Sequence, residues 1–252
     1  MSNPVATKRL FHFSMARVKR LVSLGDVVAT LLAIWTIFWP TPYYVLIACC
    51  FILPLLAICL DVWIGGALTW DTIAYRRNPL SFAPILLMPA LALGCRALGD
   101  FNFLNWQTHV AWSLLVAAII GGSACWLVPQ ARSSSRQLSN ICLFALAFGY
   151  AAVTFADTLL DPFATRTMSA TVHDKYVHVS GGVHGFSFWY NVSVAPSPPG
   201  WTWILVRPDI YDELHIGERV CVNHGSGLLG IGWLEVRPCE NAWPRWTSWR
   251  TS

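Results

Sequence analysis

The sequence predicts an α-helical polytopic membrane bundle of about five spans, followed by a small antiparallel all-β domain. Three observations support this fold class. Apolar runs long enough to cross a bilayer recur up to about residue 160 and then stop. Hydrophobic residues make up 55% of the 252 residues and charged residues only 12%, which separates the chain from ordinary soluble domains. After residue 161, short β-rich stretches alternate with Gly and Pro.

The spans follow from length, because about 20 helical residues are needed to cross a hydrocarbon core of roughly 30 Å. Within a bundle over residues 21–160, we expect spans at about 21–39, 43–60, 79–95, 109–128 and 140–158. The third is the weakest, because it is short and its Pro84 and Pro89 each remove a backbone donor. The alternative for this stretch is a re-entrant or interfacial segment.

Basic residues predict the orientation, since loops rich in Lys and Arg tend to remain in the cytoplasm. With five spans, the basic arm at residues 1–20, the segment with Arg76 and Arg77, and the loop with Arg132 and Arg136 fall on one side. We therefore expect a bacterial inner-membrane protein with a cytoplasmic N-terminus and a periplasmic C-terminal domain. If the third span did not cross, the last of these loops would lie outside, which the rule disfavours.

The β-domain is expected at residues 165–240, followed by a Trp-rich tail at 241–252. We expect strands at about 169–179, 186–194, 201–206, 218–223 and 230–237, separated by Gly- and Pro-rich breaks. So many short strands in a short segment are typical of a small barrel or sandwich. The turn at Gly217 resembles those that open strands in SH3-like or OB-like barrels, a similarity that carries no function.

Of the eight cysteines, only Cys221 and Cys239 lie in the β-domain. A lone pair in an oxidising compartment is expected to form a disulfide, and closing a loop of this length would contribute roughly 3 kcal/mol. For the two residues to face each other across a simple hairpin, the turn must be centred near Gly230. The alternative is two reduced, independent thiols in a cytoplasmic domain.

Polar side chains inside spans are functional candidates by default, because placing them in lipid is costly. Asp26 and Asp157 are the candidates in this chain. We interpret both as structural, since a proton or ion pathway usually needs several such groups at mid-membrane depth. Asp26 lies near the headgroups, and Asp157 belongs to an interfacial segment.

Tryptophans mark a second set of candidates, because Trp is enriched at membrane interfaces. They lie on an expected interfacial helix after the second span and in the tail: Trp63, Trp70, Trp243, Trp246 and Trp249. For the helix, the alternative is a continuation of the second span. For the tail, the alternatives are an aromatic lid on the β-domain and a disordered end with incidental Trp.

No motif predicts catalysis, a cofactor or a metal. Histidines concentrate in the C-terminal half without HExxH or CxxC spacing, at His173, His178, His184, His215 and His224. The stretch 225–232, GSGLLGIG, lacks the lysine of a P-loop and is interpreted as a glycine-rich turn. We therefore expect no catalytic, cofactor-binding or metal site, and a protein that is not an enzyme.

The expected function is the presentation of the β-domain to another envelope protein, to cell-wall material or to an incoming factor, with the lipid bilayer as the other partner. Nucleic acid is not expected, because the net charge is only +4 and the basic residues lie between apolar runs. A homo-oligomer stays open, since the fifth span carries a face of small residues: Ala145, Gly149, Ala152 and Ala156. Two alternatives remain: an accessory subunit of a transporter or channel, and an envelope enzyme that uses His173, Asp174 or His224.

Overall fold

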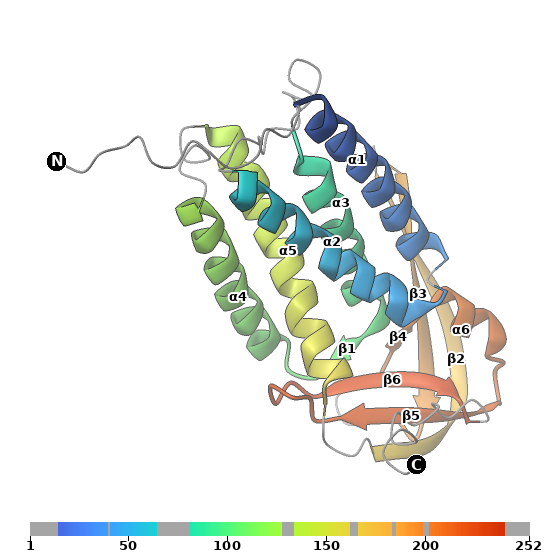
Figure 1. Ribbon diagram of the computed structural model, residues 1–252. Helices are drawn as coiled ribbons and strands as arrows, with labels where there is room; N and C mark the ends of the chain where they lie inside the picture. Colours follow the sequence, from blue (N-terminus) through green and yellow to red (C-terminus); the bar gives the residue numbers. More distant parts are fainter. Residues whose placement is uncertain are drawn as a thin grey trace, which may run out of the picture. The chain divides into compact units, whose positions relative to one another are not determined.

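The computed structural model describes residues 15–39, 41–64, 81–127, 134–161, 166–182, 185–198 and 202–239. In this part of the chain, long helices precede an antiparallel sheet, which confirms the predicted fold class (Figure 1). The chain divides into two compact units. The first is Met1–Leu93 with Ala118–Ala147, and the second is Gly94–Ala117 with Phe148–Ser252.

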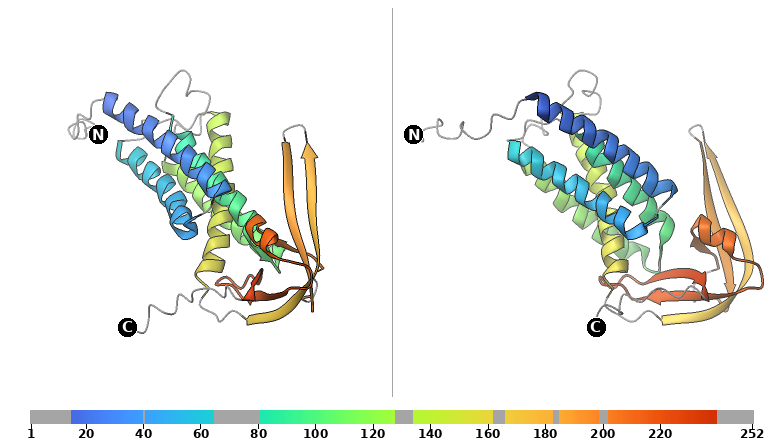
Figure 2. Two further views of the ribbon diagram at one scale, coloured as in Figure 1. Left: turned by 90° about the vertical axis from the view of Figure 1, so that its right-hand side faces the viewer. Right: turned by 45° about the vertical axis from the view of Figure 1, so that its right-hand side comes forward.

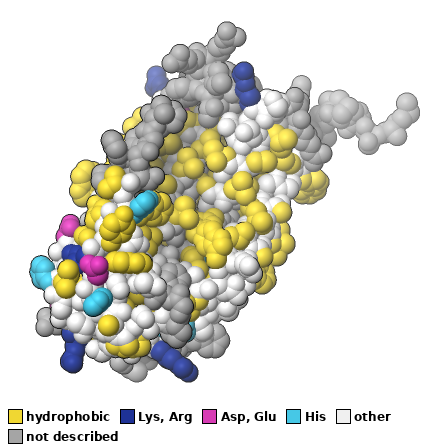
Figure 3. Space-filling model, turned by 180° about the vertical axis from the view of Figure 1, so that it is seen from behind, with side chains coloured by type: hydrophobic (Ala, Val, Ile, Leu, Met, Phe, Trp, Pro, Cys, Tyr) yellow, Lys and Arg dark blue, Asp and Glu magenta, His cyan; other side chains and the backbone are white. Residues whose placement is uncertain are grey.

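Five described helices are long and apolar enough to cross a membrane. They are α1 (Met15–Phe38), α2 (Tyr43–Ile64), α3 (Ala83–Asp100), α4 (Trp106–Leu127) and α5 (Ser135–Leu159). The weakest expected span is the helix α3. Its Pro84 lies in the first turn, where the missing N–H would have no helical partner, and the helix continues through Pro89. Figure 3 shows, on one face, apolar side chains spread over the helices with few charged ones among them, as suits contact with lipid.

In the first unit, one face of α1 is buried. Its buried side chains recur every three or four residues and include one carboxyl group: Val22, Asp26, Ala29 and Ala33. Farther along α1, the Thr36 hydroxyl donates to the Leu32 carbonyl at 2.8 Å and lies 3.3 Å from Cys50 Sγ of α2. Because the Thr36 proton is already engaged, the Cys50 thiol acts as the donor between the two helices.

In the second unit, α4 and α5 approach closely at Gly149. A Cβ on Gly149 would lie 2.9 Å from the backbone nitrogen of Ala117, so a side chain here would push the two helices apart. At this point the small-residue face of the fifth span packs within the chain. A polar contact lies nearby, because His109 Nε2 of α4 is 3.0 Å from Thr154 Oγ1 of α5.

The sheet contains six antiparallel strands in the order β1-β6-β5-β2-β3-β4. The strands are β1 (Asn102–Phe103), β2 (Arg166–Gly182), β3 (Gly185–Ala195), β4 (Ile204–Val206), β5 (Arg219–Gly225) and β6 (Trp233–Pro238). Strands β2 to β6 lie where the sequence predicts strands. Two elements were not expected: the short helix α6 (Pro208–Glu213) and the strand β1, which comes from the connection between α3 and α4.

Strand β1 nearly closes the sheet into a barrel. It pairs with β6 through Asn102↔Leu234 and Phe103↔Trp233. The Asn102 carboxamide also reaches β4 at the other end of the strand order: Nδ2 donates to the Leu205 carbonyl at 2.8 Å, and Oδ1 accepts from the Leu205 amide at 3.0 Å. One side-chain amide therefore satisfies two backbone groups that an adjacent strand would otherwise pair.

The barrel core is built from inward-facing aliphatic residues of β2 to β6: Ala170, Val172, Val192, Val194, Ile204, Val206, Val220, Val222, Leu234 and Val236. Ile210 of helix α6 and Leu214, the residue that follows the helix, also belong to this core. Lys175 of β2 holds the C-terminal end of α6, because its Nζ donates to the carbonyls of Tyr211 and Leu214. A cation at this end also interacts favourably with the helix dipole.

Candidate interaction surface

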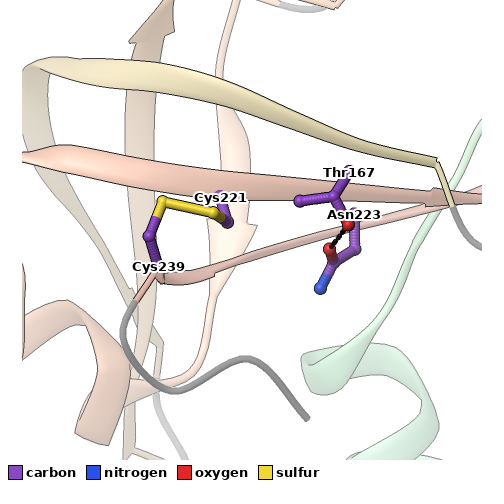
Figure 4. Close-up of a disulfide and its surroundings, with 4 residues drawn as sticks. All are labelled: Thr167, Cys221, Asn223 and Cys239. Carbon is purple, nitrogen blue, oxygen red and sulfur yellow. Dashed lines mark hydrogen bonds between the residues drawn. A yellow bond between two sulfur atoms is a disulfide. The ribbon is translucent and has the colours of Figure 1, made fainter. Parts of the chain in front are cut away.

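The hairpin of β5 and β6 carries a disulfide. It joins Cys221 to Cys239, 18 positions apart, with their Cα atoms 4.8 Å apart (Figure 4). Cys221 pairs directly with Arg237, so Cys239 lies two residues beyond the position opposite Cys221. This register centres the hairpin on Leu229, next to the position expected at Gly230. The bond ties the start of β5 to the end of β6.

The glycine-rich turn of this hairpin wraps around Asp157, whose side chain is buried at the end of α5. The Leu229 amide donates to Asp157 Oδ1 at 2.7 Å, and the Leu228 amide donates to the Asp157 carbonyl at 3.1 Å. Gly227 faces the same carboxylate and has φ +74°. Backbone amides in such a turn can bind an anion. In this chain the anion is the protein's own carboxylate, so Asp157 anchors α5 to the hairpin.

Asp26 lies in the first unit, whereas Asp157 lies in the second. A cavity of about 200 Å³ lies next to the Asp26 position, between α1, α2 and α3. Its lining is apolar and consists of Leu21, Val22, Gly25, Leu53, Leu56, Ala57, Leu60, Phe82 and Ile85. None of these lining residues is ionisable, and Asp26 itself is not among them, so this lining gives no chemical basis for an ion path.

Of the tryptophans expected at the interface, one lies within the described residues. Trp63 lies in the last turn of α2. The other four lie outside the described residues: Trp70, Trp243, Trp246 and Trp249.

The described histidines of the C-terminal half do not form a cluster with other ligands. His173 lies at the irregularity in the β2–β3 register, His178 farther along β2, His215 before β5 and His224 on β5. His184 lies outside the described residues. In the described part of the chain, no group of three or more His, Cys, Asp or Glu side chains is arranged to hold a metal ion.

The feature that the sequence analysis missed is a two-stranded extension of the sheet. Strand β2 pairs with β5 from Arg166 to Thr171, but its pairing with β3 continues from Thr171 to Gly182. Strand β4 pairs with β3 only at Tyr190–Val192. We call residues 174–182 of β2 and 185–193 of β3 the ribbon. Figure 2 shows its two long strands side by side.

At its base, β2 is held against the rest of the barrel. Thr167 of β2 lies opposite Asn223 of β5, and its hydroxyl donates to Asn223 Oδ1 at 2.9 Å (Figure 4). The Val172 amide donates to the Glu218 carbonyl at 2.9 Å, just before β5 begins. The ribbon therefore starts from a well-bonded part of the sheet.

One face of the ribbon is aromatic. His178 lies opposite Trp189 and Tyr176 opposite Asn191, and alternate residues of a strand share a face. The ring centroid of Trp203, just before β4, lies 6.1 Å from that of Tyr176. The exposed fractions are 52% for Tyr176, 40% for Trp189 and 38% for Trp203. Exposed aromatic rings that gather on one face mark interaction sites, because Tyr and Trp are enriched at protein interfaces.

Beyond Asp174 and Lys175 at its base, the ribbon also lacks charge. The sequence has no Asp, Glu, Lys or Arg from Tyr176 to Ala195. Natural proteins usually guard exposed strands with charges, prolines or bulges. This signal was present in the sequence, as two β-rich stretches joined by glycines, but only the pairing of the strands shows that the stretch extends beyond the barrel.

The arrangement offers aromatic rings and backbone amides, and it suits binding more than chemistry. No protein-family model, curated protein or solved structure matches the chain.

Proposed function

We propose that the chain is a non-enzymatic integral membrane protein that presents the aromatic face of the ribbon to another envelope protein. The observation that carries this proposal is the joint exposure of Tyr176 and Trp189 on a stretch of the ribbon without charged residues, with the exposed Trp203 next to Tyr176. Burying a large apolar side chain is worth about 1.5–3 kcal/mol. A partner that covers these rings would gain this stabilisation, which the chain alone leaves unused.

A protein fits this face better than a flat ligand. The ring planes of Tyr176 and Trp203 are inclined by 56°, and those of Tyr176 and His178 by 43°. Stacking on a sugar or a base favours a flat ring platform, whereas inclined rings form a corrugated surface. Protein hot spots are built from such aromatic anchors with neighbouring side chains packed between them.

We further propose that the protein lies in a bacterial inner membrane with the N-terminus in the cytoplasm and the barrel in the periplasm. The disulfide supports an oxidising compartment, since such bonds are rare in the cytosol. The distribution of Lys and Arg between the spans supports the same orientation. Because β1 pairs with β6, the α3–α4 connection and the barrel must lie on the same side of the membrane. They do so if both α4 and α5 cross the membrane.

The partner proposal can be tested by placing a photo-crosslinking phenylalanine analogue at Trp189 of the full-length protein in its native membrane. The matched control carries the analogue at Ile216, which is 64% exposed and lies between α6 and β5, outside the ribbon. We expect a discrete protein adduct from position 189 and a weaker one when Trp203→Ala removes a neighbouring ring. Equal adducts from both positions, or adducts with lipid alone, would contradict the proposal.

The orientation is tested separately with a C-terminal reporter that is active only in the periplasm. We expect activity in intact cells. Activity of a matched cytoplasm-specific reporter at the same position would contradict both the orientation and the compartment in which the disulfide forms.

A further inference from the structure

We propose that the outer edge of β2 in the ribbon pairs with the same edge of a second copy of this chain. Two ribbons would then form one four-stranded antiparallel sheet. The pairing deepens the proposed function, because it would join two aromatic faces into one larger surface. Only the benefit of this pairing rests on the proposed function. The edge that would pair is defined by the backbone alone.

The hydrogen bonds of Lys175 show which backbone groups face outward. Its N–H donates to Oδ1 of the Asp174 side chain at 2.7 Å. The Val172 amide donates to Glu218 on the β5 side, and one extra residue of β2 lies between Val172 and Asp174 in the pairing with β3, so the Lys175 N–H faces the same outer side. Backbone groups of successive strand residues point to opposite edges. The N–H groups of Val177, Val179 and Gly181 therefore point away from β3. Within the described strands, no strand pairs with β2 along this edge.

The energetics favour an additional strand. Five cross-strand pairs, from His178↔Trp189 to Gly182↔Gly185, have no third described strand beside them. A two-stranded hairpin is marginally stable in water, whereas three or more strands with an apolar face are stable. Pairing between two ribbons would give each β2 strand a neighbour on both sides.

A second copy matches the edge in shape and in charge. An antiparallel pair of identical strands is complementary to itself about a two-fold axis. The edge has no charged residue from Tyr176 to Gly182, so two copies can meet there without like-charge repulsion, although the whole chain carries +4. Val177 and Val179 favour strand structure, and no proline interrupts the segment. Val179 is also 50% exposed, so its side chain does not block the approach.

The pairing would change how a partner is bound. Two aromatic faces on one sheet would offer two linked sites, and linked sites bind a repeated or dimeric partner more tightly than either site alone. This is the property by which self-pairing would serve the proposed function.

The test compares Val179→Pro with Val179→Thr in the full-length chain. The proline removes the outward N–H and leaves the ladder with β3 intact, whereas threonine keeps the N–H and a β-branched side chain. Donor- and acceptor-tagged copies are reconstituted in phosphatidylethanolamine–phosphatidylglycerol vesicles and diluted with lipid, and energy transfer is measured. We expect the original chain and Val179→Thr to associate, and Val179→Pro to associate about tenfold or more weakly, because each copy loses one bond.

Val179→Lys is the second variant, since it keeps every N–H and places a charge from each copy at the shared edge. It should also weaken association, and formation of the Cys221–Cys239 bond reports that each variant has folded. A monomeric original chain throughout the dilution series would overturn the proposal, as would association that survives Val179→Lys. If the analogue at position 189 gives no protein adduct while copies of the chain still associate, the result counts against the partner proposal alone.

Discussion

Asn102 and Leu205 are joined by two hydrogen bonds across 103 positions of the sequence. The carboxamide of Asn102 offers a donor and an acceptor side by side, like the N–H and C=O groups of a strand. They bond the carbonyl and the amide of the same residue, Leu205. Through this pair, β1 and β4 close most of the gap between the two ends of the sheet. A side chain from the connection between two membrane helices thus links the two ends of the strand order.

Asn102→Asp should open this closure. The variant keeps the size of the side chain but replaces the donor with a second acceptor, which would face the Leu205 carbonyl. An unsatisfied or repelled polar group of this kind costs about 2–3 kcal/mol. Hydrogen exchange of the amides in β4 measures the change as a lower free energy of local opening.

The control for this prediction is Asn105→Asp, the same substitution three residues away. Asn105 Oδ1 accepts the Thr108 amide at 3.2 Å at the start of α4, and Asp serves this capping role as well as Asn. Exchange in β4 should be unchanged. If both variants leave β4 equally protected, the carboxamide does not close the barrel.

Gly227→Ala should loosen the turn around Asp157 more than Gly230→Ala does. The two glycines have nearly the same φ, +74° and +73°, so both substitutions incur similar backbone strain of about 1–2 kcal/mol. A Cβ on Gly227 would collide with the Asp157 carboxylate, whereas a Cβ on Gly230 has no neighbour within 4 Å. We expect an additional loss of about 1–3 kcal/mol for Gly227→Ala from this clash, measured by exchange of the Leu229 amide.

Combining Gly227→Ala with Asp157→Ala tests the origin of that difference. Asp157→Ala alone removes the bond to the Leu229 amide and should destabilise the turn. If the clash causes the effect, the double variant will be more stable than the sum of the single changes predicts. Simple additivity would show that Gly227 acts through its backbone conformation and not through Asp157.

Cys221→Ser should destabilise the β5–β6 hairpin by roughly 3 kcal/mol, the value expected for the loop that the disulfide closes. The rate of proteolysis within the hairpin under native conditions measures this local opening. Cys142→Ser is the control, because Cys142 is an exposed free thiol on α5. Reductant should accelerate cleavage of the original chain and of Cys142→Ser, and have no further effect on Cys221→Ser.

Ionisation of Tyr211 is expected to lower the free energy of unfolding at alkaline pH. Partial burial raises the pKa of its phenol, and the charges of Asp174 and Asp212 raise it further. A group with a higher pKa in the folded state contributes stability that is complete below its unfolded value, about 10, and declines as the pH rises toward the folded value. The Tm, measured by thermal unfolding between about pH 9 and 11, should therefore fall less steeply with pH for Tyr211→Phe than for the original chain.

Asp212→Asn provides an intermediate case, because it keeps the phenol and removes one of the charges near it. Its decline with pH should lie between those of the original chain and Tyr211→Phe. Identical pH profiles for all three proteins would show that Tyr211 does not contribute to this alkaline loss.

The fold class could be predicted because hydropathy and strand patterns are local. The span at α3 and the strands β2 to β6 each carry their own signal. Strand β1 could not be found this way: Asn102 and Phe103 are too few to show a period, and the Leu234 carbonyl that Asn102 approaches lies 132 positions away. Helix α6 has a proline at its start but is too short to show helical periodicity.

The interaction surface was predictable only in part for the same reason. The disulfide followed from elimination, since two cysteines remained after the apolar runs were set aside. Asp157 and the glycine-rich turn could each be recognised in the sequence. However, 72 positions separate Asp157 from Leu229, and neither segment indicates that it contacts the other. The ribbon required knowledge of where β4 and β5 stop pairing, which tertiary structure alone decides.

The origin of β1 also sets an order of events during biosynthesis. Its partner β6 is Trp233–Pro238, the last described strand, so β1 leaves the ribosome well before the residues that complete it. Until β6 has been translated and delivered to the same side of the membrane, the nascent barrel lacks both its seam and its final strand. A stop codon before Trp233 would therefore leave an unfinished barrel attached to helices that have already been inserted.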